Sequence, residues 1–156
     1  MRRAEGNERG VNAAVLVVRL LLGGLLVVAG ALKVGHAAEL ASTIANFRLL
    51  PAAITGPLAV GLPYFELLLG GYLIAGLFTR GAAAVAAAQF ALYAGVIASA
   101  VLRHIPANCG CFGPGDAATA DWPHVALDLA LAGASGFVAY RAPGALALDR
   151  KLRNAA

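Results

Sequence analysis

The stretch that decides the fold is VNAAVLVVRLLLGGLLVVAGALKV, residues 11–34, an apolar segment interrupted by Arg19 and closed by Lys33. A helix needs about 20 apolar residues to cross the hydrocarbon core of a bilayer. The segment is therefore predicted to span a membrane. A secretory signal peptide is the alternative, because the Ala-Gly-Ala sequence at 29–31 resembles a cleavage site. The length of the apolar stretch and its internal arginine favour a retained helix.

The composition of the whole chain agrees with a membrane protein. Of its 156 residues, 60% are hydrophobic and 13% are charged, whereas charged residues make up about a quarter of an ordinary soluble domain. Further apolar segments follow the first, so the sequence predicts an all-α bundle of four transmembrane helices. The predicted spans are residues 11–34, 57–78, 82–102 and 123–140.

These spans form one predicted membrane domain, residues 11–141, between a basic N-terminal segment (1–10) and a basic tail (142–156). Residues 35–56 include an amphipathic piece that is expected to lie along the membrane surface or re-enter the bundle. The short turn at 79–81 predicts that the second and third spans are antiparallel neighbours. The third span is rich in alanine, which lets helices approach closely in lipid and predicts a central position.

The distribution of basic residues predicts the topology. If the N-terminus is cytoplasmic, eight basic residues share its side of the membrane: Arg2, Arg3, Arg9, Arg80, Arg141, Arg150, Lys151 and Arg153. Three lie on the other side: Lys33, Arg48 and Arg103. The positive-inside rule thus predicts that both termini are cytoplasmic and that the loop at 103–122 is periplasmic or extracellular, on a bacterial inner membrane. The net charge of +4 is explained by these helix ends and tails, and no basic face points to nucleic acid.

That external loop contains the only two cysteines of the chain, in Asn108-Cys109-Gly110-Cys111-Phe112-Gly113. A disulfide across so small a ring is possible but strained, and it requires the freedom of Gly110 to adopt a positive φ. Strained, exposed disulfides are typically catalytic or regulatory. A structural clip is the alternative, although closing so small a loop removes little chain entropy. A metal site with His104 lacks a fourth ligand, so no metal is expected.

Charged residues inside the predicted spans are the second group of candidate site residues. Arg19, Glu66 and Asp128 each fall within a span, where an unpaired charge costs several kcal/mol. Arg19 and Lys33 share one helix face with two glycines, at which another helix can approach. Together with Lys33, these residues are predicted to form a polar seam that Gln89 and Tyr93 can contact.

The seam has several candidate roles: it can move protons during thiol oxidation, polarise a quinone carbonyl or hold the cysteine loop. Structural ion pairs that lock helix register are the alternative. His104 and His124 flank the cysteine loop and are candidates to lower a thiol pKa or to relay a proton.

The order of these features resembles the MauE branch of the DoxX-like membrane proteins over roughly residues 15–140. The resemblance rests on the cysteine motif at 108–113 above all, together with the charges of the first two spans, Leu49-Leu50-Pro51, Leu62-Pro63 and Trp122-Pro123. It implies a four-helix integral membrane protein linked to methylamine utilisation. In that family MauE is thought to help mature periplasmic methylamine dehydrogenase, a disulfide-rich enzyme, beside a thioredoxin-like partner.

The leading functional hypothesis is therefore thiol-disulfide exchange, or redox-linked maturation of a periplasmic enzyme. Cys109 and Cys111 would react, and a soluble partner or a membrane quinone would take or supply the electrons. A non-enzymatic scaffold that docks a redox partner is one alternative, and a small-solute or ion carrier is another. Motifs for ATP hydrolysis and for the standard hydrolase chemistries are absent from the sequence.

Overall fold

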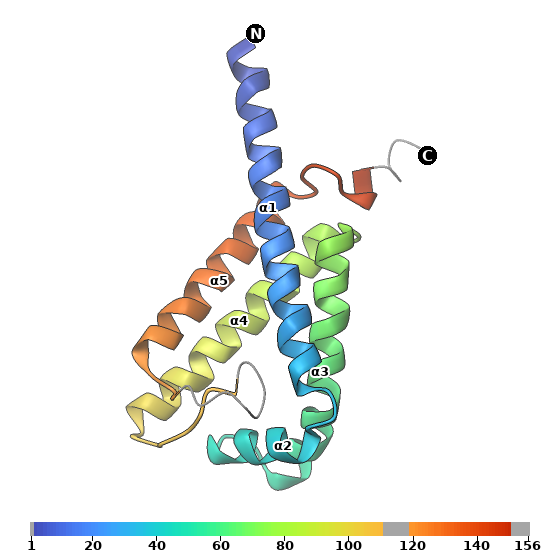
Figure 1. Ribbon diagram of the computed structural model, residues 1–156. Coiled ribbons are helices and arrows are strands. Elements are labelled where there is room, and N and C mark those ends of the chain that lie inside the picture. Colours follow the sequence, from blue (N-terminus) through green and yellow to red (C-terminus); the bar gives the residue numbers. More distant parts are fainter. Residues whose placement is uncertain (1, 111–118, 151–156) are drawn as a thin grey trace.

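The computed structural model describes residues 2–110 and 119–150 of the chain. These residues form five α-helices: α1 (Arg2–Lys33), α2 (Ala37–Asn46), α3 (Ala52–Ala75), α4 (Thr79–Leu102) and α5 (Trp122–Arg141) (Figure 1). Within the described ranges there is no β-strand, only an isolated bridge between Asn108 and Thr119. The prediction of an all-α fold is confirmed.

Three of the helices are long and apolar enough to cross a membrane: Gly10–Lys33 of α1, all of α3 and all of α4. Helix α5 is the fourth long helix, with 20 residues. Helix α3 begins at Ala52, earlier than the predicted span at residue 57. Pro51 directly precedes the helix, and Pro57 lies inside it and does not start it. It ends at Gly76, whose φ of 68° is the left-handed conformation that terminates helices.

Helices α1 and α3 form one close pair, and glycines make the contact possible. A Cβ atom placed on Gly70 of α3 would lie 2.6 Å from the backbone oxygen of Gly23 on α1. A Cβ atom on Gly30 would lie 2.7 Å from the backbone oxygen of Pro63. The glycine-bearing face predicted for the first span is therefore the face that packs against α3.

Helices α4 and α5 form the second pair. The two pairs meet at the end of the molecule that carries both termini and splay apart toward the other end, where α2 lies (Figure 1). Helices α3 and α4 are antiparallel neighbours near their short connection, as the turn predicted, but they diverge from it. The divergence leaves space between the pairs at the level of α2.

The chain after α5 folds back and closes the terminal end. The Asp149 carboxylate accepts hydrogen bonds from the backbone nitrogens of Phe78 (2.8 Å) and Thr79 (2.7 Å), which satisfies the first amides of α4. The backbone nitrogen of Ala145 donates a hydrogen bond of 3.2 Å to the backbone carbonyl of Asn12 on α1. The segment after α5 thus joins α1 to the α3–α4 connection.

The glycine contact between α1 and α3 gives the first prediction. We expect Gly70→Ala to destabilise the protein by about 1–3 kcal/mol, because the added methyl group meets backbone that cannot move without separating the helices. Gly71→Ala is the matched control, since nothing lies within 4 Å of a Cβ at that position. Thermal unfolding in detergent would compare the two variants. Equal midpoints would show that the close approach is unimportant.

Candidate functional site

Four polar side chains from three helices meet between the two helix pairs, away from the α3–α4 connection. Lys33 Nζ, at the end of α1, lies 2.8 Å from each carboxylate oxygen of Glu66 on α3. From α4, the Tyr93 hydroxyl donates to Glu66 Oε1 at 2.7 Å and Gln89 Nε2 donates to the same atom at 3.3 Å. We call Lys33, Glu66, Gln89 and Tyr93 the carboxylate cluster.

The cluster is buried, and its geometry explains how a charged pair is tolerated there. Lys33 is 3% exposed and Glu66 1% exposed. A buried ion pair must be well aligned and must have its remaining hydrogen-bonding capacity satisfied to offset the loss of hydration. Gln89 and Tyr93, one helical turn apart on α4, supply the additional donors to Glu66 and are themselves joined by a hydrogen bond of 2.9 Å. The cluster therefore ties α1 and α3 to α4.

A mainly apolar cleft of about 530 Å³ lies on one side of the cluster. We call it the α1/α5 cleft, because residues 18–29 of α1 and 124–134 of α5 form most of its walls. Its polar lining residues are Glu66, Tyr93, His124 and Asp128.

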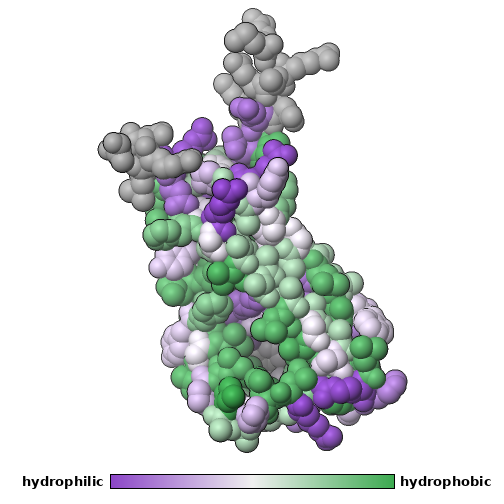
Figure 2. All heavy atoms as spheres, turned by 180° about the vertical axis from the view of Figure 1, so that it is seen from behind, coloured by the Kyte–Doolittle hydropathy of each residue, from purple (hydrophilic) through white to green (hydrophobic). Residues whose placement is uncertain are grey.

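A second cavity of about 340 Å³, the thiol pocket, lies on the other side of the cluster. It is lined by Cys109 and Gly110, by Lys33 and Tyr93 of the cluster, and by apolar side chains of α2, α3 and α4. Figure 2 shows a hollow between mainly hydrophobic residues in the half of the molecule away from the termini. Tyr93 lines both cavities, so the cluster separates the thiol from the α1/α5 cleft.

Cys109 is half-buried, and a backbone hydrogen bond closes the loop that carries it. The backbone nitrogen of Ala120 donates to Ala107 at 2.9 Å, which joins the two ends of the cysteine loop. Gly110 has a φ of 66°, as the sequence predicted, and a Cβ there would lie 2.8 Å from Thr43 Cγ2 on α2. A glycine is therefore required twice, for its conformation and for its contact with α2. Cys111 lies outside the described residues.

Helix α2 is fixed against the cysteine loop. Phe47 is buried with Ala100 and Ala107, and the Arg103 guanidinium donates to the Phe47 carbonyl. This confirms that residues 35–56 contain an amphipathic helix. Its role in walling the thiol pocket was not predicted, because an amphipathic pattern does not show what the apolar face covers.

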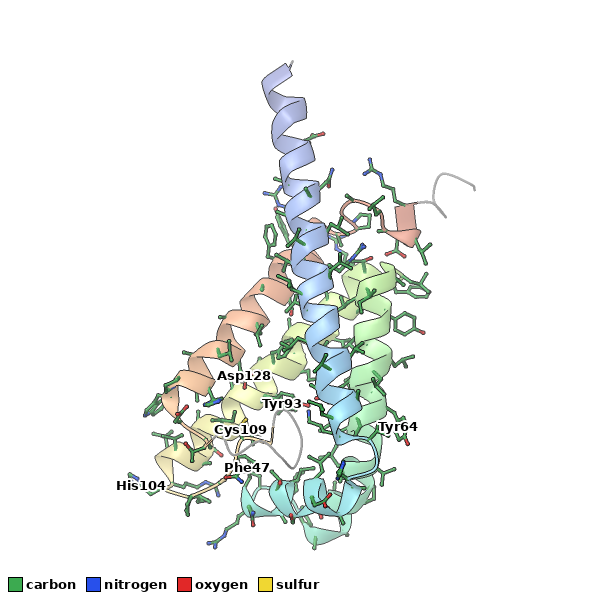
Figure 3. The ribbon with its side chains drawn as sticks, viewed as in Figure 1. Phe47, Tyr64, Tyr93, His104, Cys109 and Asp128 are labelled. Carbon is green, nitrogen blue, oxygen red and sulfur yellow. The ribbon has the colours of Figure 1, made fainter. Side chains whose placement is uncertain are left out.

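Asp128 faces the α1/α5 cleft from α5 and does not join the Lys33–Glu66 pair. It is 6% exposed, and its Oδ2 atom has no hydrogen-bond partner among the residues that the structure describes. Figure 3 shows Asp128, Tyr93 and Cys109 in the space between the helix pairs.

Arg19 lies apart from the carboxylate cluster. It is 1% exposed, and its Nη1 atom donates to the Pro143 carbonyl at 3.2 Å, in the segment that closes the terminal end. Arg19 is thus separate from the rest of the predicted seam, because it lies about four helical turns from Lys33 along α1.

The two histidines occupy different surroundings. His104 is exposed at the outer edge of the molecule, just after α4 (Figure 3). His124 is half-buried, lines the α1/α5 cleft and contacts Asp121 through its ring and its backbone nitrogen. The ring contact and then the backbone hydrogen bond lower the pKa of Asp121, which caps the start of α5. Neither histidine lines the thiol pocket.

Comparison with known proteins agrees with the order of these features. The family model described as methylamine utilisation protein MauE matches residues 11–141. A methylamine utilization protein MauE from Paracoccus denitrificans is 31% identical over 130 residues, which cover 83% of this chain and 70% of the relative. No solved structure matches the chain. The match extends over all of the carboxylate cluster, both cavities and the cysteine loop, and the chain belongs to the MauE family of methylamine utilisation proteins.

Proposed function

We propose that this MauE-family protein carries out thiol-disulfide exchange at the outer face of the bacterial inner membrane, in the maturation of a periplasmic enzyme of the methylamine dehydrogenase type. The reacting groups are Cys109 and Cys111. The partner is a thioredoxin-like protein or the maturing dehydrogenase itself. The observation that carries the proposal is the position of Cys109, half-buried in the wall of the thiol pocket beside Lys33 and Tyr93.

The location of the thiol relative to the basic residues supports this placement. Cys109 lies at the opposite end of the bundle from both termini (Figures 1 and 3). The basic residues concentrate at the terminal end, which the positive-inside rule assigns to the cytoplasm. With α5 as a fourth span, the cysteine loop then faces the oxidising compartment, where disulfides persist, and the outer helix surface contacts membrane lipid.

The atoms and electrons of the exchange balance between the two cysteines and the partner disulfide, with no further reactant. One cysteine thiolate attacks a sulfur of the partner disulfide and releases the other partner sulfur as a thiolate. The second cysteine then attacks the mixed disulfide, which leaves an intramolecular disulfide here and a reduced dithiol on the partner. The reverse sequence oxidises the partner. Either direction transfers two electrons.

Residues of the carboxylate cluster are proposed to assist the exchange, because Lys33 and Tyr93 line the same pocket as Cys109. Lys33 places a positive charge in the lining of the same pocket as Cys109, and a nearby cation favours a thiolate. Glu66, Tyr93, Asp128 and His124 are proposed to pass protons, whereas Arg19 and His104 lie away from the pocket and are left with structural or surface roles.

The cysteines provide the direct test. Cys109→Ser or Cys111→Ser is expected to abolish exchange with the partner, because one thiol can form but not resolve a mixed disulfide. The measurement is the redox state of the partner in cells, followed by thiol alkylation and mass shift. Asn108→Ser is the control in the same loop. Unchanged partner oxidation in both serine variants would contradict the proposal, and a partner that still co-purifies with the double variant would indicate a scaffold.

Gly110 tests whether the loop geometry sets the thiol reactivity. Gly110→Ala is expected to shift the midpoint potential of the cysteine pair and slow exchange, because the methyl group meets Thr43 Cγ2 and a positive φ costs a non-glycine residue about 1–2 kcal/mol. Adding Thr43→Ser removes Cγ2 and retains the hydroxyl that bonds to Glu39, so it should restore part of the rate. An unchanged midpoint potential and exchange rate in Gly110→Ala would show that the loop conformation does not set the thiol reactivity.

The Lys33–Glu66 pair can be tested for a role beyond structure. Lys33→Met alone should destabilise the fold by about 3–5 kcal/mol, because it leaves a buried carboxylate unpaired. The double variant Lys33→Met/Glu66→Leu should recover stability. If the pair assists thiol exchange, the double variant will regain the thermal stability of the wild type while its exchange rate stays low. Recovery of both would assign the pair a structural role only.

A further inference from the structure

Asp128 is the one charged side chain near the carboxylate cluster whose hydrogen bonding the fold leaves incomplete within the described residues. It is 6% exposed and lines the α1/α5 cleft, and its Oδ2 atom has no partner. A buried carboxylate oxygen without a donor costs free energy comparable to a lost hydrogen bond to a charged group. Such a group calls for a ligand that donates a hydrogen bond.

The shape of the cleft indicates the rest of that ligand. Its wall on α1 extends from Val18 to Ala29, about 16 Å along the helix axis. The polar lining residues lie toward one end, at the level of Asp128 and Tyr93, and the far end is apolar and includes Val18 and Ala134. An elongated molecule with a small polar head and a hydrocarbon tail fits this distribution.

The charges of the lining exclude a phosphate head group. Among the described residues the cleft is lined by the Asp128 carboxylate, by Glu66, whose charge is already paired with Lys33, and by no lysine or arginine. A phosphate would be repelled there, whereas a neutral head group with hydroxyl donors would be held. Leu21 and Leu127, which also line the cleft, are 69% and 52% exposed, so the cleft reaches the apolar outer surface of the helices.

We propose that the α1/α5 cleft binds a membrane hydroquinone, with a ring hydroxyl donating to Asp128 and the isoprenoid tail lying along α1. Its use in electron transfer rests on the proposed function and requires the Cys109–Cys111 dithiol to reach the ring past the carboxylate cluster, which separates the two cavities. Oxidation of the dithiol by the quinone would then give the disulfide and the hydroquinone, with two electrons and two protons transferred. The binding itself does not depend on the cysteines. The chain contains only two cysteines. A second electron carrier within the membrane would therefore be a bound ligand and not another thiol pair of this chain.

The test uses decylubiquinol and its dimethyl ether, which has the same ring and tail but no hydroxyl donors. Binding to the purified full chain in detergent under argon is followed by quenching of Trp122, the single tryptophan, in the first turn of α5. We expect the quinol to bind about tenfold more tightly than the ether, the difference that one hydrogen bond to a charged group makes. Asp128→Leu should remove this difference.

Two further variants separate binding from folding. Asp128→Leu should unfold at a temperature no lower than the wild type without ligand, because it replaces a buried, incompletely bonded carboxylate with an apolar side chain. Ala134→Phe should weaken the quinol and the ether alike by filling the apolar end, whereas Ala130→Phe, on an exposed position of the same helix, should not. Equal binding of quinol and ether to the wild type, or the same preference in Asp128→Leu, would overturn the proposal.

The same titration in the Cys109→Ser/Cys111→Ser variant distinguishes this site from the proposed function. If this variant binds quinol as tightly as the wild type, and the wild-type thiols never change redox state, the quinol site is retained and the exchange activity is rejected. Exchange with a soluble partner in a protein that binds quinol and ether equally would reject the site and retain the activity.

Discussion

The structure depends on the buried bond between Lys33 and Glu66. Helices α1 and α3 pack through glycines, and α4 packs on α5, but the two pairs diverge from their short connection. The ion pair lies away from that connection, and Tyr93 and Gln89 extend its hydrogen bonds to α4. Because two charges can be buried only when their hydrogen bonds are satisfied, this one arrangement fixes the relative position of three helices.

The divergence also creates the two cavities. Close backbone contacts at Gly23, Gly30 and Gly70 join α1 to α3, whereas the described glycines of α4 and α5 make no such contact. Helix α2 and the cysteine loop wall part of that space and form the thiol pocket, and α1 and α5 enclose the cleft beside Asp128. Tyr93 borders both cavities, which places the carboxylate cluster between the thiol and the cleft.

The opposite end of the molecule is built differently. There the chain after α5 returns to the bundle, bonds to Arg19 and caps α4 through Asp149. One end is thus joined by hydrogen bonds between side chains and backbone, and the thiol pocket lies toward the other. This asymmetry agrees with the proposed thiol exchange at one side of the membrane.

Much of the fold followed from the sequence alone. Long apolar segments predict helices because backbone groups in lipid must bond within their own segment, and the motif around Cys109 and Gly110 identified the loop and its positive φ. Local pattern also singled out the charged residues. Only the tertiary structure decided their partners, because Lys33, Glu66 and Tyr93 lie far apart in the chain and meet through helix packing. The same limit applies to Arg19, which bonds to a tail segment with no periodic signal, and to Asp128, whose incomplete hydrogen bonding depends on distances between helices that no sequence period encodes.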